Sequence, residues 1–180
     1  MAEYFEKVDE PTLVTVQKKE SERYLLHIGL FILTFISTTF AGADWISGKG
    51  GPYELSYLWN GLPYSISIMF IISCHEFGHY FAARFHKIKA TLPFYIPFPA
   101  LAGFLNFGTM GAVIKTKSPI RTNKAMFDIG VAGPIAGFIA TLIVLIYGFM
   151  NVPTVDFLLN IHPDYYSPEY GKDSLQLEFG

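Results

Sequence analysis

One stretch of the sequence has the residue types and spacing for metal chemistry, the run His75, Glu76, Phe77, Gly78 and His79. Residues four apart lie on one helical face one turn apart, so the two imidazoles can converge on one metal ion. Glu76 would lie beside the ion rather than bind it. Zinc lowers the pKa of bound water to about 7, and a neighbouring carboxylate can take the remaining proton. The motif therefore predicts a hydrolytic site with Zn²⁺ as cofactor, His75 and His79 as ligands and Glu76 as catalytic base.

The helix that would carry this motif is apolar. Residues 62–74 contain no charged side chain, and the apolar stretch continues to Phe85. A helix over residues 62–85 rises about 1.5 Å per residue, which is long enough for a hydrocarbon core of roughly 30 Å. Ionisable residues inside such a span are costly and mark function by default. The alternative, a soluble helix with a surface histidine pair, requires this run to be an ordinary core helix.

The composition favours a membrane protein. Hydrophobic residues make up 51% of the chain and charged residues 16%, below the roughly 25% of soluble domains. We predict an all-α polytopic membrane protein with three transmembrane helices, at residues 24–43, 62–85 and 129–150. A single cysteine, Cys74, excludes an intrachain disulfide. Its direction on the helix differs from that of the histidine pair, which indicates a packing role.

Basic residues predict the orientation of these spans. The largest group lies between the second and third spans and the next before the first span, whereas Lys49 and Lys172 are alone in the remaining segments. Cytoplasmic segments carry the excess of Lys and Arg, so the N-terminus and residues 87–124 should be cytoplasmic. We accordingly divide the chain into a cytoplasmic tail (1–23), a membrane-embedded core (24–150) and an external segment (151–180).

The segment between the second and third spans is apolar but cannot be a regular helix. Residues 90–114 contain three prolines and three glycines among β-branched and aromatic residues. This pattern predicts a membrane-inserted, strand-like segment lying against protein, plausibly beside the metal helix. An exposed strand edge there could pair with a substrate backbone, and we predict Asn106, Gly108 and Gly111 as substrate-binding residues. A merely interfacial loop is the alternative.

The start of the third span contains Asp128 and the step Gly133-x-x-x-Gly137. The glycines permit close helix approach, so packing is a sufficient explanation for them. Asp128 is either a helix-start acid or a cavity group, and we favour the helix start. His27, in the first span, is interpreted as a hydrogen-bonded interior histidine without a catalytic role.

With these motifs in view, residues 60–137 resemble the site-2 protease family of intramembrane zinc metalloproteases. The resemblance rests on the H-E-F-G-H helix, the run from Gly108 to Ile114, and Gly133-Pro134-Ile135-Ala136-Gly137, and is greatest to the branch with bacterial members and plastid relatives. It implies that His75 and His79 bind zinc and that Glu76 is the catalytic acid/base. It also implies cleavage of transmembrane segments of membrane-anchored proteins. We therefore expect a protein substrate and the lipid bilayer as partners, no nucleic acid, and a bacterial inner-membrane location with the N-terminus cytoplasmic.

The third zinc ligand departs from the family pattern. A catalytic site has three protein ligands, and the family takes its third from an Asp in an Asn-x-x-Pro...Leu-Asp-Gly pattern that this sequence lacks. Asp156 and Asp164 should be external, and Asp128 lacks the motif. We therefore expect an N-terminal fragment that is inactive alone, with the third ligand beyond residue 180. Two alternatives remain: a non-catalytic membrane scaffold, and a membrane zinc peptidase of the prenyl-protein type, which the Pro/Gly segment fits poorly.

Overall fold

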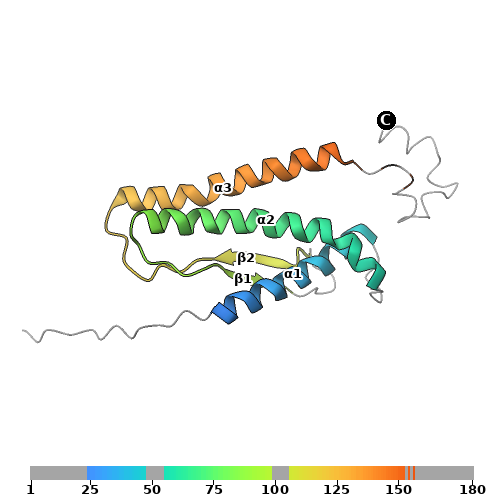
Figure 1. The fold of residues 1–180 in the computed structure, drawn as a ribbon, viewed down its shortest axis with the longest axis horizontal. Helices are drawn as coiled ribbons and strands as arrows, with labels where there is room; N and C mark the ends of the chain where they lie inside the picture. The colour runs from blue at the N-terminus through green and yellow to red at the C-terminus, as the bar shows by residue number, and fades with distance from the viewer. Residues whose placement is uncertain (1–23, 48–54, 99–105, 153, 155, 157–180) are drawn as a thin grey trace, which may run out of the picture.

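The computed structural model describes residues 24–47, 55–98, 106–152, 154 and 156. Three helices and a hairpin follow one another along the chain, and their bounds are α1 (Tyr24–Ser47), α2 (Leu55–Phe85), β1 (Phe94–Pro97), β2 (Thr109–Val113) and α3 (Asn123–Met150). Helix α2 packs against both α1 and α3, and the hairpin lies along α2 next to α1 (Figure 1). The predicted tail 1–23 and most of the predicted external segment 151–180 fall outside the described residues.

The three predicted helices are present, but two of them begin earlier than expected. Helix α2 begins at Leu55 and includes Pro63, where the prediction began at residue 62. Proline inside a helix lacks a backbone donor and crowds the preceding turn, and Pro63 is exposed to the outside of the molecule. Helix α3 begins at Asn123 because Thr122, in extended conformation, caps it by accepting a hydrogen bond from the Ala125 amide at 3.2 Å.

Two of the described helices are long and apolar enough to cross a membrane, over Tyr24–Ile46 and Asn123–Met150. Only 33% and 22% of these stretches is buried within the molecule. A core helix of a soluble protein would be mostly covered, whereas α3 turns outward large side chains such as Phe138, Ile146 and Phe149. This exposed apolar surface fits integration into a membrane. Helix α2, which carries the ionisable motif, does not meet the same criterion, so the third span remains a prediction.

The strand-like segment is a two-stranded antiparallel hairpin, as its proline and glycine pattern predicted. Tyr95 pairs with Ala112 and Pro97 with Thr109, so the register shifts by one residue between them. Gly111 lies in this bulge with φ of 97°, a conformation that disfavours any side chain. The hairpin therefore bends where glycine allows it.

Polar contacts fix the hairpin between α1 and α2. The buried His27 ring is hydrogen-bonded through Nδ1 to the Pro93 carbonyl at 3.0 Å, which confirms the interior interpretation of this histidine. The Tyr95 and Ser73 hydroxyls lie 2.7 Å apart and join β1 to α2. These bonds hold the hairpin against the two helices.

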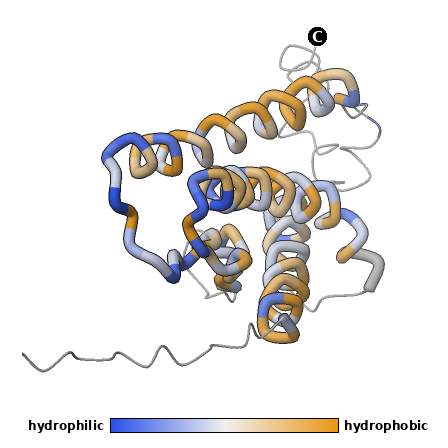
Figure 2. The backbone as a smooth tube through the Cα atoms, turned by 60° about the vertical axis from the view of Figure 1, so that its left-hand side comes forward, coloured by the Kyte–Doolittle hydropathy of each residue, from blue (hydrophilic) through white to orange (hydrophobic). Residues whose placement is uncertain are grey.

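Hydrophilic residues gather at one end of the molecule, where α2 ends and α3 begins (Figure 2). Beneath them lies the main cluster of buried hydrophobic residues, which joins the end of α2, the segment that follows it and the start of α3 and consists of Ala83, Ile88, Ala90, Ala125 and Ile129. The cluster fixes the two helix ends relative to each other, close to the H-E-x-x-H motif.

Candidate metal centre

The two motif histidines meet as their spacing predicted. Their Nε2 atoms lie 3.1 Å apart, with the rings edge to face at a centroid distance of 4.8 Å. Two nitrogens bound tetrahedrally to zinc at about 2.0–2.1 Å would be roughly 3.3 Å apart. The pair of His75 and His79 therefore presents two nitrogens at a separation that one zinc ion can bridge.

A backbone carbonyl of α3 orients one of these rings. The Nδ1 atom of His79 lies 2.6 Å from the Ile129 carbonyl oxygen. A carbonyl can only accept, so Nδ1 carries the proton and Nε2 keeps its lone pair for a metal. Such hydrogen bonds fix the tautomer and orientation of metal-binding histidines. The sequence gives no direct signal for this contact, because any residue supplies a carbonyl.

Glycines of α3 provide the space for both rings. A β-carbon at Gly133 would lie 2.1 Å from Nε2 of His79, and one at Gly137 would lie 3.0 Å from Nδ1 of His75. Gly78, between the histidines, would collide in the same way with the Ala132 carbonyl at 2.5 Å. The G-x-x-x-G step thus packs helices closely, as predicted, and also seats the two imidazoles. Ile129, Gly133 and Gly137 recur every four residues, a spacing that could have assigned them to one face.

Glu76 is buried and faces the hairpin. Glu76 is only 7% exposed, and its carboxyl lies close to the backbone amide of Ile114, just after β2. A buried carboxylate is stabilised by such a donor. The base candidate, the histidine pair and the end of β2 therefore adjoin one another, a proximity that the sequence predicted only as a plausible arrangement.

The residues present fit two positions of a zinc site. Within the described part of the chain, no group of three His, Cys, Asp or Glu side chains could hold a metal ion. Cys74 is a free, half-buried cysteine next to His75, in agreement with a packing role. The third ligand thus remains the prediction of an Asp beyond residue 180.

Asp128 corrects the preferred interpretation of a helix-start acid. Helix α3 begins at Asn123 and has no acid in its first turn, so Asp128 lies in the second turn. Its carboxylate instead pairs with Nε2 of His86 at 2.8 Å, just beyond the end of α2. The early cap at Thr122 is the cause, since it moves Asp128 away from the helix terminus and towards α2.

The predicted substrate-binding residues occupy different environments. Gly108 is buried against α1, where its carbonyl accepts a hydrogen bond from Ser37 at 2.6 Å. Asn106 accepts a hydrogen bond from the Gly108 amide through its side chain at 2.9 Å and one from the Trp45 indole through its carbonyl at 2.7 Å. Gly111 has open space around it, with nothing within 4 Å of the position that a β-carbon would take. Only Gly111 leaves room for another chain, and the role of all three remains a prediction.

The helical core, the outward apolar surface and the histidine pair define a metallopeptidase-like protein of membrane type. Residues 63–172 match peptidase family M50, and since this is more than half of the chain, the chain belongs to that family of site-2 proteases.

Three curated relatives share part of the sequence. The probable zinc metalloprotease EGY1, chloroplastic, of Oryza sativa subsp. japonica is 35% identical over 136 residues, 64% of this chain and 22% of that protein. EGY2, chloroplastic, of Arabidopsis thaliana is 29% identical over 101 residues, 56% and 17% of the two chains. EGY1, chloroplastic, of Arabidopsis thaliana is 34% identical over 76 residues, 42% and 13%. The matched region thus spans about a fifth or less of each relative, and no solved structure matches the chain.

Proposed function

We propose that this chain forms the metal-binding part of an intramembrane zinc metalloendopeptidase that cleaves transmembrane segments of membrane-anchored proteins. The observation that carries the proposal is the pair of Nε2 atoms 3.1 Å apart beside a buried carboxylate. A structural zinc site needs no general base, so Glu76 favours catalysis over a scaffold. When bound, zinc supplies a water acidified enough to attack an amide at neutral pH.

Residues of this chain would orient the metal ligand, transfer the proton and guide the substrate. The Ile129 carbonyl holds the proton on Nδ1 of His79 and so leaves Nε2 free. The Glu76 carboxylate accepts the proton of the attacking water and later returns it to the amine that leaves. The backbone amide of Ile114 lies close to this carboxylate, at the end of β2. A substrate chain extended along β2 would therefore run past both the base and the histidine pair.

We further propose that the protein lies in a bacterial cytoplasmic membrane with the N-terminus and residues 87–124 on the cytoplasmic side. The imbalance of basic residues supports this orientation. His79 precedes Phe85, the last residue of α2, by six positions, or about 9 Å along the helix axis. Water would then reach the metal from the cytoplasm, and the cut would fall within the membrane near that side.

The test uses the complete protein reconstituted in vesicles with a membrane-anchored substrate. Glu76→Gln should keep bound zinc while losing turnover by about 10²–10⁴-fold, because it removes the base and leaves the ligands. His75→Ala and His79→Ala should lose the metal as well. Zinc content by elemental analysis and cleavage by mass spectrometry separate the two effects.

Cys74→Ala is the matched control, since cysteine is a common zinc ligand and adjoins His75. It should retain both zinc and turnover. Unchanged zinc content in the two histidine variants would refute the metal assignment. Full turnover in Glu76→Gln would instead refute the catalytic role of Glu76, whereas a complete wild-type protein without turnover would favour the scaffold. A cleavage site mapped to a soluble external region would overturn intramembrane cleavage even if zinc were required.

A further inference from the structure

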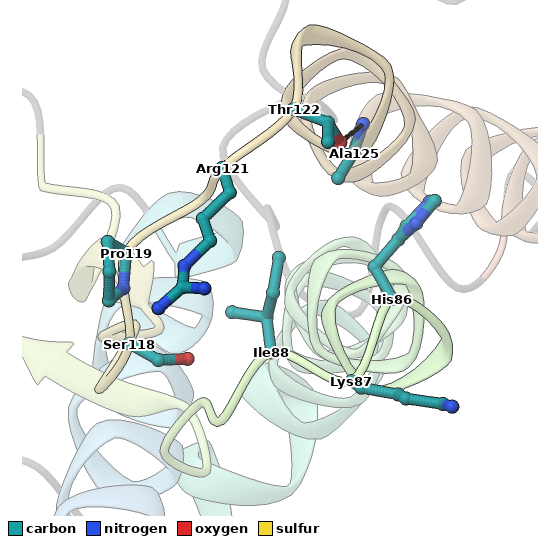
Figure 3. Close-up of a pocket in the computed structure, with 8 residues that line it drawn as sticks. All are labelled: His86, Lys87, Ile88, Ser118, Pro119, Arg121, Thr122 and Ala125. Atoms are coloured by element: carbon teal, nitrogen blue, oxygen red, sulfur yellow. Dashed lines mark hydrogen bonds between the residues drawn. The ribbon is translucent and has the colours of Figure 1, made fainter.

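We propose that a cleft at the hydrophilic end of α2 and α3 binds the phosphate of an anionic phospholipid headgroup. The cleft has a volume of about 490 Å³ and lies apart from the histidine pair, between the end of α2, the segment that follows β2 and the start of α3 (Figure 3). Its walls are formed by His86, Lys87, Ile88, Ser118, Pro119, Arg121, Thr122 and Ala125. This set, called the basic cleft below, combines cationic and polar groups with apolar walls.

Basic residues outnumber acidic residues around the basic cleft. From Phe77 to Phe127 the sequence has no Asp or Glu, but it has seven Lys and Arg, namely Arg84, Lys87, Lys89, Lys115, Lys117, Arg121 and Lys124. The next acid, Asp128, is already paired with His86 at 2.8 Å. Clustered like charges with low-dielectric walls produce a positive potential that attracts anions.

Arg121 is the main candidate for contact with a phosphate. Figure 3 shows its side chain extending from the segment before α3 towards Ser118 and Ile88, across the cleft. Among the described residues, its guanidinium forms no ion pair. A guanidinium presents paired N–H donors that match two phosphate oxygens.

Ser118 adds a hydrogen-bond donor to the basic cleft. The Ser118 hydroxyl accepts a hydrogen bond from the Lys89 amide at 3.1 Å, so its own proton is available for a phosphate oxygen. Lys87 points outward at the rim (Figure 3), where it adds charge without filling the cleft. At the start of α3 the Ala125 amide is already bound by Thr122. The side chains, rather than the helix terminus, therefore make the site.

The surroundings of the basic cleft favour a lipid over a free anion. Large apolar side chains are exposed at the same helix ends, with Phe85 83%, Met126 66% and Phe127 69% exposed. Apolar surface directly beside basic residues is the arrangement that suits acyl chains below an anionic headgroup. The inference rests on the membrane insertion of α3 that belongs to the proposed function, but not on zinc or proteolysis.

Binding can be measured on the complete protein in neutral detergent by native mass spectrometry. The probes are a short-chain phosphatidylglycerol, the matching phosphatidylcholine and inorganic phosphate. We expect phosphatidylglycerol to bind most tightly and Arg121→Gln to weaken it by about tenfold, the loss typical of one charge-assisted contact. Arg121→Lys should fall between the two, because it keeps the charge but loses the paired donors.

Lys124→Gln is the matched control, since Lys124 is exposed on the first turn of α3 and does not line the cleft. It should change phosphatidylglycerol binding by less than about twofold. An equal loss in Lys124→Gln and Arg121→Gln would overturn the site in favour of diffuse surface attraction. Equal binding of the two lipids, or phosphate binding as tight as the lipid, would overturn the headgroup assignment. Thermal stability in detergent, measured in every variant, reports whether the fold is intact, and zinc content measured on the same samples separates failure here from failure of the proposed enzyme.

Discussion

At the scale of single residues, the candidate metal centre depends on backbone atoms, which the residue type does not reveal. The motif histidines are evident from sequence because two ligands and a base have fixed offsets. The partner of His79 is not, since it is the carbonyl of Ile129 on a helix fifty residues further along the chain. The sequence misplaces Asp128 for a related reason, because the role of this residue depends on where α3 is capped. Sequence thus predicts the groups that would bind the metal, and the structure identifies what orients them.

Gly133 provides the sharpest test at this scale. In Gly133→Ala the new methyl would lie 2.1 Å from Nε2 of His79, so the ring must move by about 1 Å. Metal sites tolerate only a few tenths of an ångström in ligand position. We expect zinc affinity to fall by about 10–100-fold, the range typical when support of a ligand is lost. Competition with a fluorescent chelator measures this affinity in the complete protein.

Two further glycines of α3 allow the loss of zinc affinity to be compared at positions with less crowding. Gly130→Ala is the control, since nothing lies within 4 Å of its added methyl, and alanine there should also raise helix stability slightly. Gly137→Ala, with a contact of 3.0 Å to His75, should lie between the two. Equal zinc affinity in all three variants would show that the glycines serve helix packing alone.

At the scale of elements, the hairpin is predictable in kind but not in detail. Three prolines and three glycines exclude a spanning helix, and β-branched residues between them indicate strands. The bulge at Gly111 and the contact from Ile114 to Glu76 depend on how the hairpin docks against α1 and α2, which no local pattern encodes. The early start of α2 escapes prediction because Pro63 is a common helix boundary, although here it is tolerated on an exposed face.

The hairpin glycines should respond differently to valine. Gly111→Val occupies open space, so it should leave zinc bound while slowing cleavage several-fold, by crowding the strand edge where a substrate chain would pair. Valine also strains a φ of 97°, at a cost of roughly 1–3 kcal/mol. Zinc content and cleavage rate, measured on the same reconstituted sample, check the result. Normal cleavage in this variant would exclude β2 as the substrate edge at that position.

Gly108→Val should damage the fold itself. A β-carbon there would lie 2.4 Å from Cα of Thr38, and the residue has a φ of 72°. Neither the backbone of α1 nor a β-branched side chain can relieve this collision easily, so we expect a destabilised protein with reduced thermal stability. Heating scans of the detergent-solubilised protein measure the loss. A variant with normal thermal stability and slow cleavage would instead place Gly108 at the substrate.

At the scale of the whole molecule, orientation in the membrane is the property to test. Single cysteines at positions 49 and 87 in a Cys74→Ala background report which side each segment occupies. Because basic residues gather around position 87, we expect an external, membrane-impermeant thiol reagent to label position 49 and not position 87. The reverse pattern would invert the orientation, and with it the side from which water reaches the histidine pair.

The seam between α2 and α3 limits how a substrate can arrive. Along this seam, Gly78 meets the Ala132 carbonyl, and Gly133 and Gly137 meet the imidazoles so closely that no added methyl group fits without displacement. A transmembrane helix is about 10 Å wide with its side chains. It could enter between α2 and α3 only if the contacts that orient His75 and His79 were broken. On the side of α2 bordered by β2, by contrast, nothing lies within 4 Å of the position that a β-carbon of Gly111 would take. If the chain cleaves membrane-anchored proteins as proposed, the same close packing leaves only the side of the hairpin open to a substrate, which would have to arrive already unwound.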